Sequence, residues 1–253
     1  MLRFLSSNQA FKNVSARNRG YRHRDHHRYK HTVAVQLDYY MSSQFAGIAY
    51  AMTEGLYLKA GITNLNFLPI CPVGLELERV RDHRNSNTDD AVIGSVEQNI
   101  FTPILYQEPT LKVKAIAAMF RTSPLCLASI INGTNDDKDE IIVGAHEDTV
   151  SLLKRILKEE KDDKFSVISS PRATKNVNLM EGTLDMIQAY ATTEVPTLER
   201  LGVNVKSLPL EGLNGAKLGY SQMLFSPEED LINEDKRKII QSFLHATFEG
   251  WGM

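Results

Sequence analysis

The sequence has few of the features that several protein classes require. It holds only two cysteines among 253 residues, too few for a disulfide scaffold or a structural zinc site. No apolar run approaches the roughly 18–20 residues that span a bilayer, so the chain is not an integral membrane protein. Hydrophobic residues make up 42% and charged residues 24%, which excludes bulk disorder and is typical of one large globular domain or two lobes.

Sequence motifs of common enzyme classes are also missing. The chain has no GxGxxG, GxxxxGK[ST], HExxH or GxSxG, so dinucleotide, P-loop, zincin and α/β-hydrolase functions lack support. We interpret His83, His146 and His245 as surface or packing residues, because none has an obvious Cys or Asp partner in the sequence. Cys71 and Cys126 lie in apolar surroundings, which indicates buried structural thiols. We therefore predict no catalytic residue, no metal site and no cofactor.

Charge is divided unevenly along the chain. Residues 1–30 carry eight basic residues and one acid, whereas residues 31–253 carry 21 basic and 30 acidic residues. The acidic body has no broad face that could neutralise phosphate, so nucleic acid is not an expected partner. The Arg-rich, acid-poor segment 1–30 is typical of an organelle transit peptide, which predicts a mitochondrial or plastid protein. The alternatives are a disordered basic tail or a wrongly joined upstream exon, on a protein that is otherwise cytoplasmic.

Strand-like runs alternate with helix-like stretches along the rest of the chain. We expect strands at residues 32–37, 65–69, 91–96, 113–120, 125–131, 141–144, 165–168, 186–190, 203–208 and 219–225. We expect helices at 45–61, 73–80, 97–107 (broken by Pro103), 150–157 (capped by Asp148 and Thr149), 177–181, 197–201 and 235–248. This order predicts a layered α/β protein with a largely parallel sheet.

Polar clusters follow five of the predicted strands, at residues 38–44, 95–99, 121–123, 144–149 and 188–194. Ligands of α/β proteins bind at the carboxyl ends of strands, although any one cluster could equally consist of capping and turn residues. Tyrosine rings, amides and carboxylates suit a small polar or heteroaromatic ligand. The candidate ligand-binding residues are Asp38, Tyr39, Tyr40, Gln44, Ser95, Glu97, Gln98, Asn99, Ser123, Glu147, Thr149, Gln188, Tyr190 and Glu194.

Several stretches resemble, in order, the SsuA-like solute-binding proteins. That group includes alkanesulfonate, nitrate and pyrimidine-precursor binders of ABC importers and the fungal thiamine-pyrimidine-precursor synthases. The likeness covers about residues 32–251, and the stretches that carry it are Leu37-Asp38-Tyr39, Glu54-Gly55-Leu56-Tyr57, Asp90-Ala91-Val92-Ile93-Gly94, residues 115–125, residues 184–190 and residues 219–225.

The resemblance implies a type 2 periplasmic-binding-protein fold, in which two α/β lobes enclose a ligand cleft. Lobe 1 would comprise residues 32–122 and 218–253, and lobe 2 residues 123–217. The chain would cross between them at 121–124 and near 215–219. Family ligand positions map onto the loops at 38–44, 95–99 and 144–149. Relatives continue for several helices beyond the position of Met253, so we expect a truncated gene product.

The sequence departs from the pyrimidine-binding relatives at positions that matter for chemistry. It has Tyr39 where they carry Trp and Phe45 where they carry His. It lacks the substrate histidine of the fungal synthases in the stretch 95–99 and their cysteine cluster near 219–225. The resemblance therefore favours a non-enzymatic binder of a thiamine-pyrimidine precursor or a similar small solute. The alternatives are an enzyme of thiamine-pyrimidine biosynthesis, which would need iron and pyridoxal phosphate, and a non-catalytic remnant with an interaction role. The oligomeric state is not predicted.

Overall fold

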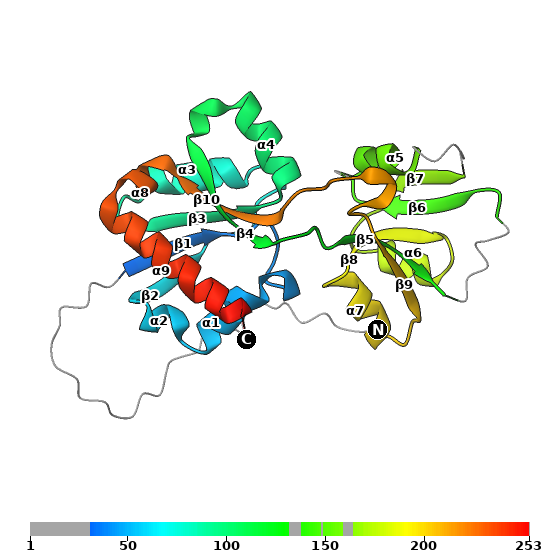
Figure 1. Cartoon of the computed structure of the whole chain (residues 1–253), viewed down its shortest axis with the longest axis horizontal. Coiled ribbons are helices and arrows are strands. Elements are labelled where there is room, and N and C mark those ends of the chain that lie inside the picture. The colour runs from blue at the N-terminus through cyan, green and yellow to red at the C-terminus, as the bar shows by residue number, and fades with distance from the viewer. Residues whose placement is uncertain (1–30, 132–137, 148, 159–163, 253) are drawn as a thin grey trace.

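A computed structural model describes residues 31–131, 138–147, 149–158 and 164–252 (Figure 1). The basic segment 1–30 and the expected helix cap Asp148 lie outside the described residues, as does most of the charged run that follows residue 158. Figure 1 shows two bodies side by side, each built around one sheet. We call the part around the first sheet lobe 1 and the part around the second sheet lobe 2.

Sheet A, in lobe 1, has five strands in the order β2-β1-β3-β10-β4. Strands β1, β2 and β3 run parallel to one another, and β10 lies antiparallel between β3 and β4. Their bounds are His31–Gln36 for β1, Ile62–Phe67 for β2, Ala91–Val96 for β3, Val113–Phe120 for β4 and Ser221–Pro227 for β10. The strands of sheet A thus come from residues 31–120 and from a return of the chain near its C-terminal end.

Sheet B, in lobe 2, repeats this arrangement with the order β7-β6-β8-β5-β9. Strand β6 pairs in parallel with β7 and β8, whereas β5 lies antiparallel between β8 and β9. Their bounds are Leu125–Ile130 for β5, Ile141–Ala145 for β6, Phe165–Ser169 for β7, Met186–Tyr190 for β8 and Val205–Pro209 for β9. All five lie within residues 125–209.

Four of the five strands in each sheet run in one direction, as expected of a largely parallel sheet, and one strand, β10 or β5, makes the sheet mixed. In each sheet an antiparallel strand follows a connection that carries the chain from one lobe to the other. Strand β5 begins sheet B directly after residues 121–124, and β10 returns to sheet A after residues 210–220. Figure 1 shows these two segments running side by side between the lobes. The first strand after each crossing between the lobes therefore runs antiparallel to both of its neighbours.

Helices cover both faces of sheet A. On one face α1 (Ala46–Thr53), α2 (Leu56–Lys59) and α9 (Glu234–Trp251) pack on a core that includes Phe45, Ile48 and Phe243. On the other face α3 (Glu76–Ser86) and α4 (Gln98–Gln107) enclose Leu77 and Phe225. The short helix α8 (Glu228–Ile232) precedes α9, and one-turn 3₁₀ helices occupy Ser43–Phe45 and Pro109–Leu111.

Lobe 2 is covered in the same way. Helix α5 (Val150–Lys158) packs Leu153 and Leu157 on one face of sheet B. Helices α6 (Lys175–Met180) and α7 (Glu194–Arg200) bury Leu179 and Leu198 on the other face. A 3₁₀ turn at Leu213–Gly215 completes the lobe. Among the described residues no helix has the length and apolarity needed to cross a membrane.

Several helix predictions differ from the structure. The stretch 45–61 forms two helices, α1 and α2, separated at Gly55 with a positive φ of 66°, and α6 and α7 begin at Lys175 and Glu194 rather than at 177 and 197. Helix α3 begins at Glu76 rather than near residue 73. Gly74 takes a positive φ of 96°, which is outside helical geometry, so the helix can begin only after it. Helix α4 continues through Pro103 without a break. Proline removes one helical N–H group, and its lost partner would be the carbonyl of the exposed Asn99, which water can reach.

Gly94, in the middle of β3, is required by the close approach of an aromatic ring. It pairs with Phe225 of β10, and a Cβ atom at position 94 would lie 2.1 Å from Cζ of that ring. Both residues are fully buried at the junction of the parallel and antiparallel parts of sheet A. The pair therefore holds β10 against β3, directly before the loop that contributes Glu97 to the cavity described next.

Candidate functional site

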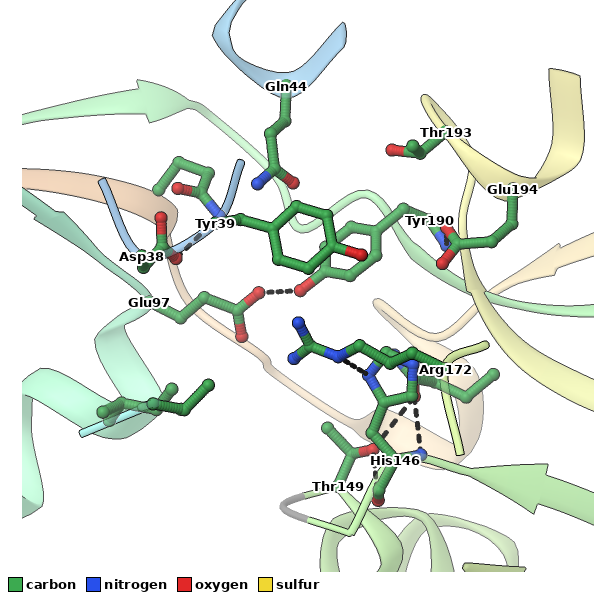
Figure 2. Close-up of a pocket in the computed structure, with 14 residues that line it drawn as sticks. Asp38, Tyr39, Gln44, Glu97, His146, Thr149, Arg172, Tyr190, Thr193 and Glu194 are labelled. Carbon is green, nitrogen blue, oxygen red and sulfur yellow. Dashed lines mark hydrogen bonds between the residues drawn. The ribbon is translucent and has the colours of Figure 1, made fainter. Parts of the chain in front are cut away.

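A cavity between the two lobes gathers polar residues from both sheets (Figure 2). Lobe 1 contributes Asp38, Tyr39, Gln44, Val73, Glu97, Ile100 and Gln222. Lobe 2 contributes His146, Thr149, Arg172, Gln188, Tyr190, Thr193 and Glu194. Most of these residues follow the carboxyl ends of β1, β3, β6, β7 and β8, where parallel strands place their loops together.

On the lobe 1 wall, three polar side chains form a closed hydrogen-bonded group. Ser95 Oγ lies 3.1 Å from Asp38 Oδ1 and 2.9 Å from Gln222 Oε1, and Gln222 Nε2 donates to Asp38 Oδ2 over 3.2 Å. Gln222 reaches this position with a positive φ of 54°, which is strained for a residue with a side chain. The backbone angle of Gln222 therefore places its side chain in the cavity wall, at the expense of regular strand geometry in β10.

The hydrogen bonds of this group indicate the protonation state of Asp38. Because the Ser95 hydroxyl has a single proton, it cannot donate to both Asp38 and Gln222. All three contacts become hydrogen bonds when Asp38 is protonated and donates to Ser95, which then donates to Gln222. Burial raises the pKa of the Asp38 carboxyl, in agreement with this assignment. Asp38 therefore carries a proton in this arrangement, and a cationic ligand group could displace it.

On the lobe 2 wall, His146 is held between two basic residues. Its Nδ1 accepts a hydrogen bond from Arg172 Nε over 3.2 Å, and its Nε2 lies 2.9 Å from Lys175 Nζ (Figure 2). Burial lowers the pKa of His146 to about 3, and the positive charge of Arg172 acts in the same direction. The imidazole is therefore neutral, with its proton on Nε2, and serves to orient the Arg172 side chain.

Lys175 is 1% exposed and has three polar partners behind the cavity wall. Besides His146, its Nζ lies 2.7 Å from the Gln188 carbonyl oxygen and 3.1 Å from Glu194 Oε1. A neutral amine satisfies all three, because two N–H groups serve the oxygens while the lone pair accepts the proton of His146 Nε2. Burial lowers the pKa of Lys175, which favours this neutral form. These contacts of the Lys175 amine hold the backbone of β8 against α6 and α7.

Three contacts join the lobes across the cavity. The Tyr190 hydroxyl donates to the Glu97 carboxylate, and Ser43 Oγ donates to the carbonyl oxygen of Thr192. The guanidinium of Arg172 lies over the ring of Tyr39, 4.8 Å from its centroid. The two walls are therefore in direct contact, and a ligand that enters must separate or replace some of these groups.

Two neighbouring side chains contact the ring of Tyr39. The ring of Tyr40 lies at a centroid distance of 3.9 Å from it, and Arg172 covers it as well. The expected stacking of a flat ligand on Tyr39 would require Arg172 to move. Tyr39 instead acts as a support for the guanidinium.

Of the candidate residues, eight line the cavity and six do not. Those that line it are Asp38, Tyr39, Gln44, Glu97, Thr149, Gln188, Tyr190 and Glu194. Ser95 lies behind Asp38, and Ser123 Oγ accepts from the Leu125 N–H over 3.3 Å. Gln98 accepts from the Tyr220 N–H over 2.8 Å. Tyr40 is 52% exposed in a neighbouring depression, and Asn99 and Glu147 are exposed on the surface.

Sequence reasoning missed several lining residues. His146 was interpreted as a surface or packing residue, but it is 6% exposed and belongs to the cavity wall. Arg172 was not singled out, although it follows the carboxyl end of β7 by three residues and satisfied the rule that found the other clusters. Gln222 gave no local signal, because its role depends on an unusual backbone angle in a strand. The expectation that both cysteines are buried is confirmed.

Comparison with known sequences identifies the chain's relatives. A family model described as "NMT1/THI5 like" matches residues 42–253. The chain belongs to the NMT1/THI5-like family. No curated protein sequence matches it.

Solved structures of similar fold are binding proteins of import systems. The ligand-binding component of an ABC-type import system from Staphylococcus aureus, with zinc bound, has a TM-score of 0.56 at 17% identity, covering 88% of this chain and 74% of that one. The aliphatic sulphonate-binding protein SsuA from Escherichia coli scores 0.58 at 15% identity, covering 87% and 72%. The nitrate-binding protein NrtA from Synechocystis scores 0.53 at 14% identity, covering 87% and 61%. These likenesses confirm the type 2 periplasmic-binding-protein fold.

The synthase alternative would need iron, and an iron site needs several His, Cys, Asp or Glu ligands around one point. Among the residues that the structure describes, no three His, Cys, Asp or Glu side chains gather around one point. In the cavity itself, His146 already uses both ring nitrogens for basic side chains. These residues therefore do not fit an iron site.

Proposed function

We propose that the protein binds a small polar or heteroaromatic molecule between its lobes, with a thiamine-pyrimidine precursor as the first candidate. The observation that carries this proposal is the cavity, which is lined by seven residues from each lobe. Membership of the NMT1/THI5-like family supports the pyrimidine assignment. The fold likeness to sulphonate- and nitrate-binding proteins supports a solute-binding role. Native mass spectrometry of the purified protein, with identification of the released molecule, tests the proposal directly.

Substitutions at the cavity wall should weaken binding of that molecule. We expect Gln44→Ala and Tyr39→Ala each to lower affinity about tenfold, which corresponds to roughly 1.4 kcal/mol of binding free energy. Gln44→Ala removes a contact with the ligand, and Tyr39→Ala removes the ring that supports Arg172. Isothermal titration calorimetry with the released molecule measures the change. Asn99→Ala and Tyr106→Ala are the matched controls, since both residues are exposed and lie outside the cavity. Equal affinity in all four variants would place the site elsewhere.

An enzyme of thiamine-pyrimidine biosynthesis is the second candidate, suggested by the family alone. We expect instead that the bound molecule leaves unchanged, because the described residues do not pair a nucleophile with a base. Burial raises the pKa of Cys71 to about 11 and of Cys126 to about 12, so both stay protonated thiols near neutral pH. Incubation with iron, pyridoxal phosphate and oxygen, followed by intact-mass analysis, should show no change. A mass loss at one histidine together with a pyrimidine product would establish the enzyme.

A further inference from the structure

The loop between β2 and α3 contributes to the cavity wall but buries little of its own surface. It comprises residues 68–75, and its Val73 belongs to the cavity lining on the lobe 1 side. Ile70, Val73 and Leu75 are 58%, 44% and 38% exposed. Cys71, in contrast, is only 6% exposed. Because so little apolar surface holds the loop in place, its opening costs little free energy.

Two buried side chains hold the ends of this loop. Gln36 Nε2 donates to the carbonyl oxygen of Pro69 over 3.3 Å, and the N–H group of Gly74 donates to Glu76 Oε2 over 2.8 Å. Both Gln36 and Glu76 are completely buried. These two hydrogen bonds therefore fix the closed position of the loop.

Glu76 has few hydrogen bonds for a buried carboxyl group. Its Oε2 accepts from Gly74, while its Oε1 is buried and has no hydrogen-bond partner among the described residues. An ionised carboxylate in such surroundings loses the hydration of its charge, whereas a protonated carboxyl group does not carry this cost. Burial accordingly raises the pKa of Glu76 to about 7. Near neutral pH this carboxyl group is thus close to the point at which it ionises.

The groups around Glu76 do not reverse the effect of burial. Burial has the largest influence on the pKa of Glu76, and hydrogen bonds from the backbone N–H groups of Glu76 and Gly74 offset it in part. The negative charge of Asp38, in the loop after β1, raises the pKa further. Cys71 stays a neutral thiol, because burial raises its pKa to about 11 despite the opposing charge of Arg79 on α3.

We propose that residues 68–75 form a flap at the lobe 1 side of the cavity that opens when Glu76 ionises. Opening brings the carboxylate into water and breaks the hydrogen bond from Gly74. The closed flap favours the protonated carboxyl group, so it is most stable below about pH 4.3, the usual pKa of an exposed glutamate. It loses stability as the pH rises to about 7. The inference concerns access to the cavity and does not depend on which molecule the cavity binds.

Cys71 provides the test, because it is the buried thiol of the flap. A methanethiosulfonate reagent added to the native protein reacts with Cys71 when the flap opens, and peptide mass analysis separates this product from that of Cys126. Each rate is divided by the rate in the denatured protein at the same pH, which removes the ordinary pH dependence of a thiol. We expect this ratio for Cys71 to rise about tenfold or more from pH 5.5 to pH 7 and then to level off. Cys126 is 1% exposed in β5, so its ratio should stay low throughout.

Variants assign the pH dependence to Glu76. Glu76→Gln keeps the shape of the side chain but cannot ionise, so the ratio for Cys71 should no longer change with pH. Glu78→Gln, at an exposed position of the same helix, is the matched control and should retain the rise. If circular dichroism shows that Glu76→Gln is not folded, Glu76→Leu replaces it, because leucine has no titrating group either.

Several results would overturn the proposal. A constant ratio for Cys71 in the unsubstituted protein from pH 5.5 to pH 7 would show that the flap does not respond to pH. A parallel rise for Cys71 and Cys126 would mean that the whole protein unfolds. A rise that persists in Glu76→Gln but disappears in Asp38→Asn would place the sensor at Asp38. None of these results bears on the proposed function, which native mass spectrometry tests separately.

Discussion

Gly94→Ala is expected to destabilise the protein by about 3–4 kcal/mol, because the added methyl group has no space. The new Cβ would lie 2.1 Å from Cζ and 2.4 Å from Cε1 of Phe225. Phe225 is fully buried and packs against Phe101 with ring centroids 5.6 Å apart, so its ring cannot turn away without opening the core. Chemical denaturation followed by circular dichroism measures the loss.

Gly252→Ala is the matched control for this prediction. A Cβ atom there would meet only the carbonyl oxygens of Phe248 and Glu249, at 3.5 Å and 3.8 Å, which are ordinary contacts. Its effect should stay within about 0.5 kcal/mol. Adding Phe225→Leu to Gly94→Ala should recover part of the lost stability, because it removes the colliding ring atoms. Equal stabilities of the two alanine variants would show that β3 and β10 are not packed in this way.

Lys175→Met is expected to cost about 3 kcal/mol, because it leaves several buried polar groups without a partner. Methionine keeps the length of the side chain but cannot donate to the Gln188 carbonyl oxygen or to Glu194. It also removes the group that faces His146 Nε2. Thermal unfolding and denaturant titration should both report the change.

Lys238→Met provides the comparison for Lys175→Met. Lys238 pairs with Glu234 one helical turn away over 2.7 Å, but both side chains are more than half exposed. An exposed pair of this kind contributes little to stability, because water screens the two charges. Adding Glu194→Gln to Lys175→Met should restore part of the stability by removing the unpaired carboxylate. If Lys175→Met were as mild as Lys238→Met, the buried hydrogen-bonded group of lobe 2 would be refuted.

The sequence predicted the bounds of three strands correctly, although one of them, β4, is partly exposed. The bounds predicted for β3, β4 and β8 agree with the structure, and every residue of β3 is buried. A continuous apolar run marks such a strand without reference to its partners. The family resemblance placed β5 in a second lobe, but the sequence did not show that β10 inserts antiparallel, because strand pairing depends on contacts between distant segments.

The candidate site was predictable to the extent that it follows strand ends. That rule found Asp38, Glu97, Gln188 and Tyr190, because each lies in a polar cluster at or just after a predicted strand. Arg172 also satisfies the rule, but nothing in the sequence shows its contact with His146, a partner 26 residues away. The rule selected Ser123 wrongly, since that hydroxyl is used by its own turn. The local sequence pattern locates the loops that follow the strands, whereas the direction of each side chain in those loops depends on packing.

The placement of β10 determines the order in which the two sheets can be completed during synthesis. Strand β4 pairs only with β10 in sheet A, and β10 begins about a hundred residues later in the chain, at Ser221. Sheet B needs only residues 125–209, so lobe 2 can fold on the ribosome while β3 and β4 still present unpaired edges. Such edges can pair with other chains. The nascent protein is thus most prone to aggregation between the completion of lobe 2 and the emergence of β10.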